Sequence, residues 1–390
     1  MNLGRRIVAS AGLAALAAAA ALSAAQGAFA SDVVGHVYVN DNTAGTNTIA
    51  AFDRHDDGTL TPTAGSPFDA GGAGTGSIIG SQGALQVTSD GRYLLAVDAG
   101  SNQISVLRVR PDGTLRPVEG SPVSSGGVKP ISIAVNGGLV YVANEGDGVT
   151  GSNYSGLILN SGGHLTPITG STFALPNTAN PGDILFNSTG TNLVGVEVGT
   201  TAASTFRIDS FTVGADGLLT PAPGSPFAAQ AAGPFGSEFS PANPAQLYVS
   251  NAHGGAGNGS VSAFNVSAAG ALSSIGASPY ADGQTAPCWV EVTHDGRHLF
   301  AVNTGSTSIS SYQILADGSL SYQTSANFRS GAGIRPFDAR LDPSGSDLYV
   351  VDAALKAVTV FAVSGGTLTE LSTSTFVLPT NATPFGIVVS

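Results

Sequence analysis

Short apolar strands separated by turns recur along the chain from about residue 35 onward. The clearest are the runs LLAVD, VYVAN, LYVSN, LFAVN and LYVVD, in which apolar residues, many of them β-branched or aromatic, precede an Asn or Asp. Each run follows another apolar stretch that commonly begins with proline, such as PISIAV, PCWVEV and PFDARL. Alternation and β-branched enrichment over so few residues are typical of β-strands.

A third element sets the length of the repeat. After each strand pair the chain reaches a turn that ends in Gly-x-Leu. The leucines of these turns are Leu60, Leu115, Leu165, Leu219, Leu272, Leu320 and Leu368, spaced 55, 50, 54, 53, 48 and 48 residues apart. Their Asp-Gly and Gly-Gly pairs are typical of hairpin turns. Four strands per repeat, in seven copies, predict an all-β fold: a seven-bladed β-propeller with four-stranded blades.

The two ends of the repeat array predict how the ring closes. The first copy begins directly at GHVYVND (from Gly35) and lacks a proline-led strand, whereas the last copy is followed by an orphan one, TPFGIVVS (Thr383 to Ser390). We therefore expect the C-terminal strand to complete blade 1, which would remove an exposed sheet edge. A WD40 propeller is the nearest alternative, but the chain has one tryptophan and no recurring Gly-His or Trp-Asp pairs.

The first thirty residues do not belong to the repeat. They have a basic start at Arg5 and Arg6, an alanine-rich apolar middle and a small-residue end at Ala28-Phe29-Ala30. This pattern predicts a secretory signal peptide over residues 1–30 and leaves a twin-arginine route open. We expect residues 31–390 to form a single propeller domain that is secreted, periplasmic or at the cell surface. No later apolar run approaches the roughly 18 residues that span a membrane.

The charge and cysteine content of the chain limit the binding partners and the covalent cross-links that we expect. The formal net charge is −12, and it becomes −14 without residues 1–30, which hold two arginines and no acid. An acidic surface repels the phosphate backbone, so no nucleic-acid partner is expected. The lone Cys288 has no partner for an intramolecular disulfide, so stability must come from the core.

With these residues in view, the pattern P-x-x-I-x-F-x-x-x-G-x-x-L-Y-V-x-N, followed by D-G-x-L and G-S-P-F, resembles the lactonase-like seven-bladed propellers with their YVTN-type strand. The resemblance covers Gly35 to Ser390, and Ser89 to Val123 carries it best. It implies the propeller fold and an activity on lactones, because some members hydrolyse phosphogluconolactone and a relative cyclises a carboxymuconate. The His-Pro-His stretch of enzymatic members is missing here from the strands SQGALQV, VKPISIAV and NPGDILF, so that catalytic set is not carried over.

Loop lengths differ between the two faces of the expected ring. Turns such as SDG, HDG and PSG, together with the Gly-x-Leu turns, are short and lie on one face. The loops DAGGAGTGSIIGS, NEGDGVTGSN and AHGGAGNGS are long and uneven and lie on the other. Binding residues concentrate on variable loops held by a rigid frame, so we expect the site at the channel mouth of the long-loop face.

Two sets of polar residues lie in the expected ring. The first closes the second strand of each blade: Asp41, Asp98, Asn144, Glu197, Asn251, Asn303 and Asp352. Such side chains commonly close turns by bonding their own backbone, and the alternative is an acidic ring that attracts a cation. The compact spacing of a calcium loop is absent, so no metal site is predicted.

The second set comes from aligning the inner strands on their leading proline. Four residues after it stand Glu238, Glu291 and Arg340 in blades 5, 6 and 7, and two residues after it stand Asp183, Trp289 and Asp338 in blades 4, 6 and 7. Period-two alternation puts these polar side chains near the axis. Neighbouring carboxylates can supply an acid and a base while an arginine holds an oxyanion, so Glu238, Glu291 and Arg340 are the predicted catalytic residues. A hydrogen-bonded network that plugs the channel is the alternative.

The predicted substrate-binding residues are Asp183, Trp289 and Asp338, with Gln86 in blade 2 and His253 in the loop NAHGGAGNGS. No cofactor is expected, since no phosphate-cradling glycine loop or nucleophile elbow occurs. Cys288 is interpreted as a small core residue. Two functions remain open: a secreted propeller that binds a small organic acid or lactone and turns it over, and a non-catalytic extracellular scaffold for a protein or glycan.

Overall fold

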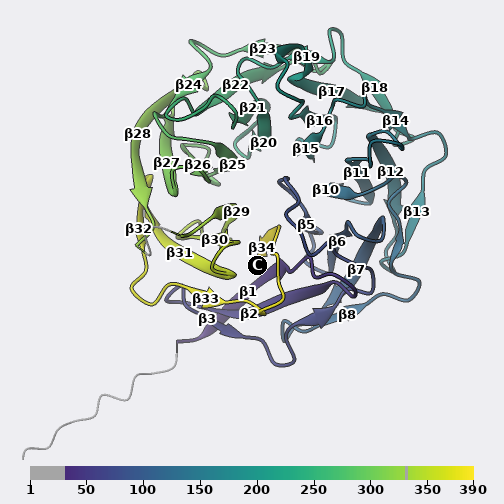
Figure 1. Cartoon of the computed structure of the whole chain (residues 1–390), viewed down its shortest axis with the longest axis vertical. Coiled ribbons are helices and arrows are strands. Elements are labelled where there is room, and N and C mark those ends of the chain that lie inside the picture. The colour runs from purple at the N-terminus through teal and green to yellow at the C-terminus, as the bar shows by residue number, and fades with distance from the viewer. Residues whose placement is uncertain (1–30, 330–332) are drawn as a thin grey trace, which may run out of the picture. The chain divides into compact units, whose positions relative to one another are not determined.

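The computed structural model describes residues 31–329 and 333–390, and its folded unit runs from Asp32 to Ser390. Within these residues the unit consists of β-strands and one short 3-10 turn, η1 (Ala203–Thr205). The strands form seven antiparallel sheets that radiate from a central axis (Figure 1). The predicted seven-bladed propeller is therefore confirmed. The predicted signal peptide lies outside the described residues, and in the rest of the chain no helix is long and apolar enough to cross a bilayer.

Six blades are built outward from the axis in chain order, and blade 1 takes its innermost strand from the end of the chain. The first strands are β34 (Ile387–Val389), β5 (Leu85–Val87), β10 (Pro130–Asn136), β15 (Pro181–Phe186), β20 (Pro234–Ser240), β25 (Pro287–Val292) and β29 (Pro336–Leu341), for blades 1 to 7. The second strands are β1 (Val33–Asn40), β6 (Tyr93–Asp98), β11 (Leu139–Asn144), β16 (Asn192–Glu197), β21 (Asn243–Asn251), β26 (His298–Asn303) and β30 (Asp347–Asp352). The third strands are β2 (Thr48–His55), β7 (Gln103–Val109), β12 (Asn153–Leu159), β17 (Arg207–Val213), β22 (Ser260–Val266), β27 (Ser308–Ile314) and β31 (Ala357–Ser364).

The outermost strand is interrupted in six blades, which the sequence did not reveal. Its two halves are β3 (Leu60–Pro62) and β4 (Phe68–Asp69), β8 (Leu115–Pro117) and β9 (Val123–Ser124), β13 (Leu165–Pro167) and β14 (Phe173–Ala174), β18 (Leu219–Pro221) and β19 (Phe227–Ala228), β23 (Leu272–Ser274) and β24 (Tyr280–Ala281), and β32 (Thr367–Glu370) and β33 (Phe376–Val377). Blade 6 has one strand instead, β28 (Leu320–Asn327). Both halves pair with the third strand, so each blade keeps four strand positions.

The repeated Gly-Ser-Pro-Phe motif marks this interruption. In blade 2, β8 pairs with the end of β7 and β9 with its start. Between them the hydroxyl of Ser121 accepts a hydrogen bond from the backbone N–H of Val106 at 2.8 Å. Serines at the same place in blades 1, 3, 4, 5 and 7 accept the same bond. The serine thus satisfies a backbone donor that the interrupted strand leaves free.

The C-terminal strand closes the ring as predicted. Strand β34 pairs antiparallel with β1, with Val388 opposite Tyr38. The backbone of Ser390 exchanges two hydrogen bonds with His36, and the Arg54 side chain donates to the Ser390 carbonyl at 3.2 Å. Arg54 also forms a buried ion pair with Asp342 of blade 7 at 3.2 Å. The first and last parts of the chain therefore share one sheet.

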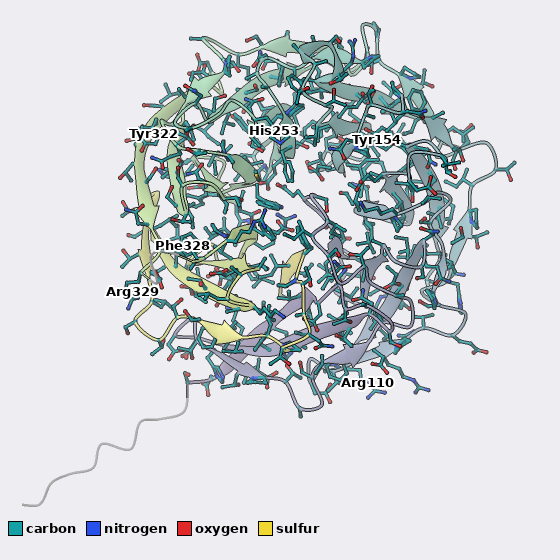
Figure 2. The ribbon with its side chains drawn as sticks, viewed as in Figure 1. Arg110, Tyr154, His253, Tyr322, Phe328 and Arg329 are labelled. Carbon is teal, nitrogen blue, oxygen red and sulfur yellow. The ribbon has the colours of Figure 1, made fainter. Side chains whose placement is uncertain are left out.

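Neighbouring blades are joined by tyrosines of the second strand. The hydroxyls of Tyr38, Tyr141, Tyr248 and Tyr349 each donate to a glycine carbonyl in the Gly-x-Leu turn of the next blade. One such glycine, Gly113, has φ +75°, and a Cβ there would lie 2.3 Å from the His36 ring. Side chains fill the space between the blades (Figure 2), and all four tyrosines are fully buried. The glycine of the repeat is therefore required both by the turn and by the packing.

Candidate active site

The inner strands leave backbone hydrogen-bonding groups unpaired at the axis, and polar side chains pair with some of these groups. One edge of each inner strand pairs within its blade, and the other edge faces the axis with unpaired N–H and C=O groups. Side chains from a neighbouring blade accept the hydrogen bonds of these donors: Ser132 Oγ from Ile184 at 3.2 Å, Asp183 Oδ2 from Ser237 at 3.0 Å, Glu238 Oε2 from Val292 at 2.7 Å and Glu291 Oε1 from Leu341 at 2.8 Å. Many of the polar side chains near the axis therefore bind neighbouring blades to each other.

The long loop between blades 1 and 2 crosses the axis. The Gln82 side chain donates to the carbonyls of Ser237 at 3.0 Å and Val290 at 3.3 Å, and it accepts from the N–H of Val290 at 3.1 Å. The Ser81 hydroxyl donates to the carbonyl of Ile131 at 2.7 Å. This segment, residues 79–83, joins blades 3, 5 and 6 and closes the channel toward the long-loop face. It also explains why the inner strand of blade 2 is short, since β5 begins only at Leu85.

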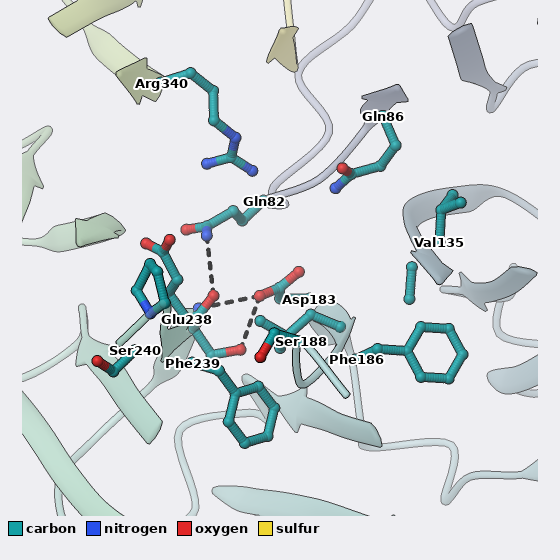
Figure 3. A pocket seen from close by; sticks show the side chains of 14 residues that line it. Gln82, Gln86, Val135, Asp183, Phe186, Ser188, Glu238, Phe239, Ser240 and Arg340 are labelled. Atoms are coloured by element: carbon teal, nitrogen blue, oxygen red, sulfur yellow. Dashed lines mark hydrogen bonds between the residues drawn. The ribbon is translucent and has the colours of Figure 1, made fainter. Parts of the chain in front are cut away.

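A pocket of about 300 Å³ remains on the other side of this segment. Its walls include Gln82, Gln86, Asp183, Glu238 and Arg340, which converge from blades 2, 4, 5 and 7 (Figure 3). Its rim includes Ser188 and Pro241, which lie in the turns between the first and second strands of blades 4 and 5. The pocket therefore opens on the short-turn face. The channel mouth of the long-loop face, where we expect the site from the sequence, is filled by this long loop, and the axial pocket lies on the opposite face.

Arg340 is held in place by two carboxylates that do not line the pocket. Its Nη1 lies 3.0 Å from Glu291 Oε2 and 3.6 Å from Asp338 Oδ1, and it also donates to the Ala339 carbonyl at 3.0 Å. Burial lowers the pKa of Arg340, but the surrounding carboxylates, Asp338 first, outweigh this and raise it. The guanidinium is therefore charged at all ordinary pH values. Its Nη2 and Nε have no hydrogen-bond acceptor among the described residues, and the side chain is 22% exposed.

Glu238 is the carboxyl group that is free to act on a ligand. Its Oε2 accepts from Val292, whereas its Oε1 has no partner among the residues that the structure describes. Burial raises the pKa of Glu238 well above its ordinary value, and the nearby charge of Glu291 raises it further, while Arg340 opposes both. A carboxyl group whose pKa is raised in this way takes up a proton more readily than an exposed one, which suits a residue that accepts and returns a proton.

Asp183 and Glu291 are less available than Glu238. Asp183 Oδ1 accepts from the Ser132 hydroxyl at 3.1 Å and the Ile184 N–H at 2.8 Å, and Oδ2 accepts two bonds from Ser237. Burial raises the pKa of Asp183 to about 7. Burial also raises the pKa of Glu291, although Arg340 opposes it, and both Glu291 oxygens are bonded. Both residues therefore support the pocket walls, and of the predicted catalytic residues Glu238 and Arg340 line the pocket whereas Glu291 does not.

Three predicted ligand-binding residues do not line the pocket: Asp338, which contacts Arg340 instead, Trp289 and His253. Trp289 is 2% exposed and packs against Phe235 and Phe337 at centroid distances of 5.2 Å and 4.9 Å, and its indole N–H donates to the Ser81 carbonyl at 2.9 Å. It belongs to the closed end of the channel. His253 is exposed in the loop between β21 and β22, on the long-loop face. Desolvation lowers the pKa of His253, and His253 is not among the residues that line the pocket.

Gln82 and Ser237 are the pocket residues that sequence reasoning missed. Gln82 occupies the place that proline takes in other inner strands, in SQGALQV, and this departure was the only sign of its role. Its contacts lie 155 and 208 residues away along the chain, and no local pattern encodes such pairs.

Most side chains of the polar ring at the ends of the second strands bond to the third strand of their own blade, and Asp98 also accepts a hydrogen bond from Asn47 of blade 1 at 2.9 Å. Asn144 Nδ2 donates to Ser155 Oγ at 3.1 Å, and Asn251 Nδ2 donates to Ser262 Oγ at 2.9 Å, in each case across to the third strand. Asp98 accepts from the Ser105 hydroxyl in the same way. These residues are buried between strands and do not meet at the axis. Across residues 31–329 and 333–390, no group of three His, Cys, Asp or Glu side chains could hold a metal ion.

Buried carboxyl groups make stability depend on pH. Desolvation raises the pKa of Asp41 and Asp183 to about 7, of Asp98 and Asp209 to about 6 and of Glu197 to about 8. Unfolding returns these groups to about 4, so between about pH 4 and 8 the folded state binds more protons than the unfolded state. The free energy of unfolding therefore falls as pH rises through this window.

We expect the melting temperature, measured by circular dichroism, to be higher at pH 5 than at pH 8 by at least about 5 °C. The Glu197→Gln variant removes the group with the highest of these pKa values and should show a smaller difference. A melting temperature that increases from pH 5 to pH 8 would contradict the raised pKa values.

Comparison with known proteins places this geometry in a family. Residues 29–151 and 228–385 match the family model described as "Lactonase, 7-bladed beta-propeller". No curated protein sequence matches the chain significantly. The matched segments include the inner strands that carry Glu238, Glu291 and Arg340, whereas Asp183 lies between the two segments.

Several solved structures share the fold. A candidate 6-phosphogluconolactonase of Bacteroides uniformis has a TM-score of 0.73 and 20% identity, over 91% of this chain and 99% of that one. A second, from Bacteroides fragilis, has a TM-score of 0.71 and 19% identity, over 92% and 98%. The periplasmic gluconolactonase of Pseudomonas aeruginosa has a TM-score of 0.66 and 18% identity, over 91% and 98%. At these identities the likeness shows the fold alone.

Proposed function

The chain belongs to the family of lactonase-type seven-bladed β-propellers, and on this premise we propose that it binds a small lactone in the Glu238–Arg340 pocket and hydrolyses it. One observation carries the proposal: Glu238 and Arg340 each keep hydrogen-bonding atoms without a partner among the described residues, and both face the same pocket of about 300 Å³. The hydrogen bonds of the other charged groups near the axis are directed at the ring itself.

The two side chains supply what lactone opening requires. In its ionised form Glu238 takes a proton from a water molecule as the water oxygen attacks the lactone carbonyl carbon. Arg340 stabilises the oxyanion that forms, because it is charged and largely enclosed, where electrostatic stabilisation is strong. When the ring C–O bond breaks, Glu238 returns its proton to the departing alkoxide. The product is a hydroxy acid, whose carboxyl group ionises at neutral pH.

The pocket also indicates the class of lactone. Arg340 is the one cation among its lining residues, and Gln82 and Gln86 offer amide groups to hydroxyls. One guanidinium serves the oxyanion and leaves no second cation for a phosphate group. We therefore propose an unphosphorylated, hydroxyl-bearing lactone such as a sugar lactone. Export through the segment 1–30 is part of the proposal, and the N-terminal sequence of the exported protein, expected near Ser31, would test it.

The test of the proposal is pH-stat titration of the mature protein with a panel of five- and six-membered lactones, phosphorylated and not. We expect acid release above the spontaneous rate on unphosphorylated sugar lactones. No release above the spontaneous rate on any lactone would contradict the proposal.

A non-catalytic scaffold for a protein or glycan is the second candidate, and one observation favours it. Asp183, Glu291 and Gln82 use their hydrogen bonds to satisfy the free edges of inner strands, which is a structural role. A scaffold would depend on the uneven loops of the long-loop face and would tolerate the loss of Glu238, so the variants discussed below separate the two functions.

A further inference from the structure

Positive charge is concentrated on blade 2. Beyond residue 30 the chain has twelve lysine and arginine residues, and four of them are Arg92, Arg108, Arg110 and Arg116. The chain as a whole carries a formal net charge of −12. A cluster of arginines on so acidic a chain is not accounted for by general solubility.

Two of these arginines are placed where they repel each other. Arg108 on β7 and Arg116 on β8 are direct partners across the antiparallel pair. Like charges directly opposite on neighbouring strands destabilise a sheet. Arg110 follows two residues after Arg108, so it projects to the same side. Among the described residues, neither Arg108, Arg110 nor Arg116 has an ion-pair partner within 4.0 Å, whereas Arg92 pairs with Asp90.

The three arginines line one hollow at the rim of the ring. The hollow measures about 510 Å³, and its lining also includes Glu119 of blade 2 and His164 of blade 3. Figure 2 shows Arg110 at the outer edge of the propeller, remote from the axial pocket. All three arginines and His164 are exposed. The hollow is therefore separate from the site of the proposed hydrolysis.

Arg108 is already oriented for binding. Its Nη2 donates to the Tyr93 hydroxyl at 2.9 Å, and its guanidinium carbon lies 5.1 Å from the Tyr93 ring centroid. Tyr93 is in turn fixed by donation to the Ser161 carbonyl at 2.9 Å. An arginine held by stacking and a hydrogen bond loses little entropy when it binds an anion.

From this geometry we infer that the Arg108–Arg110–Arg116 hollow binds a phosphate group. Guanidinium groups match the oxygens of phosphate in pairs, and three of them suit a doubly charged tetrahedral anion better than a single carboxylate. The bound anion also removes the repulsion between Arg108 and Arg116. The phosphate group belongs either to a small solute or to a phospholipid headgroup, and in both sources the non-bridging phosphate oxygens carry the negative charge that the arginines bind.

The Arg116→Glu variant separates binding from folding. The substitution places a negative charge directly opposite Arg108 across the two strands, so the variant should melt no lower than the parent protein. Arg297→Glu is the matched control, because it makes the same change in net charge at a residue 79% exposed on blade 6. Any general effect of charge on anion binding would appear in both variants.

The experiment measures calorimetric binding of inorganic phosphate at low ionic strength against matched chloride, and sedimentation with phosphatidylglycerol and phosphatidylcholine vesicles. We expect phosphate to bind the parent protein and Arg297→Glu alike, and at least about tenfold more weakly to Arg116→Glu. Arg116-dependent sedimentation with phosphatidylglycerol vesicles would also support the site and identify a headgroup as the source, whereas phosphate binding without sedimentation identifies a solute. Equal binding by all three proteins, or binding of neither phosphate nor vesicles, would overturn the inference.

Discussion

Deletion of Pro384–Ser390 is expected to unfold the protein. The deletion removes β34 and with it three residue pairs with β1, from Val37–Val389 to Val39–Ile387. It also removes the fully buried Phe385, which stacks on Phe337 at 4.6 Å, and the buried Ile387. Each large apolar side chain lost from a core costs about 2–5 kcal/mol, and the backbone hydrogen bonds add about 1 kcal/mol each. Together these losses are comparable with the whole stability of a typical protein, about 5–15 kcal/mol.

The same deletion opens the ring. Strand β1 becomes the exposed inner edge of blade 1, with unpaired backbone groups that favour aggregation. Thermal melting by circular dichroism and size-exclusion chromatography will show whether a cooperative transition and a monomer peak persist. The control is Ser390→Ala, which removes only the hydroxyl contacts with His36 and should melt like the parent protein. Unchanged melting and elution of the deletion variant would show that closure by the C-terminal strand is dispensable.

Replacement of Arg340 by lysine is expected to lower kcat for lactone hydrolysis by about 100-fold or more. Loss of a donor to a developing oxyanion has effects of about 100-fold to 1,000-fold on kcat. Lysine keeps the positive charge between Asp338 and Glu291, so the fold should survive. It cannot contact Glu291 and a ligand at once with a rigid fork of donors. The effect should therefore appear in kcat more than in KM.

Arg335→Lys is the matched control for this variant. Arg335 lies over the Phe337 ring at 5.4 Å, at the closed end of the channel, and does not line the pocket. Its replacement should leave kcat within about twofold. Steady-state kinetics on the best lactone of the panel will measure kcat for both variants and the parent protein, and melting curves will show whether each variant is folded. Equal kcat values for Arg340→Lys and the parent protein would exclude an oxyanion role for Arg340.

The propeller fold could be predicted from the sequence because each blade repeats the same local sequence pattern. The Gly-x-Leu turns and the proline-led strands fixed the blade count, and the orphan strand at Thr383 to Ser390 fixed the closure. The alignment on proline also placed Glu238, Glu291 and Arg340 at one level along the axis. In the structure, Glu291 and Arg340 form an ion pair. The repeat allows this prediction because every copy of the pattern folds into the same local geometry.

What the sequence did not reveal depends on contacts without a local pattern. Gln82 meets Ser237 and Val290 across the ring, and its glycine-rich loop has no periodicity from which to infer a course through the channel. Loop length indicated variability but not direction, so the sequence did not reveal that a long loop fills the channel mouth at which the site was expected. Trp289 was expected at the ligand, but aromatic neighbours from adjacent blades enclose it, and no alignment of single strands shows such packing.

Whether Glu238 is the catalytic base is decided by pH-stat hydrolysis of the preferred lactone by Glu238→Gln beside the parent protein. The amide oxygen that this substitution introduces can still accept the hydrogen bond of the Val292 N–H, so the variant should fold, and melting curves will confirm it. Glu145→Gln is the control, because Glu145 pairs with Lys129 on the long-loop face. We expect turnover to fall by about 100-fold or more in Glu238→Gln and to stay unchanged in Glu145→Gln. Full turnover in a folded Glu238→Gln variant would contradict this expectation.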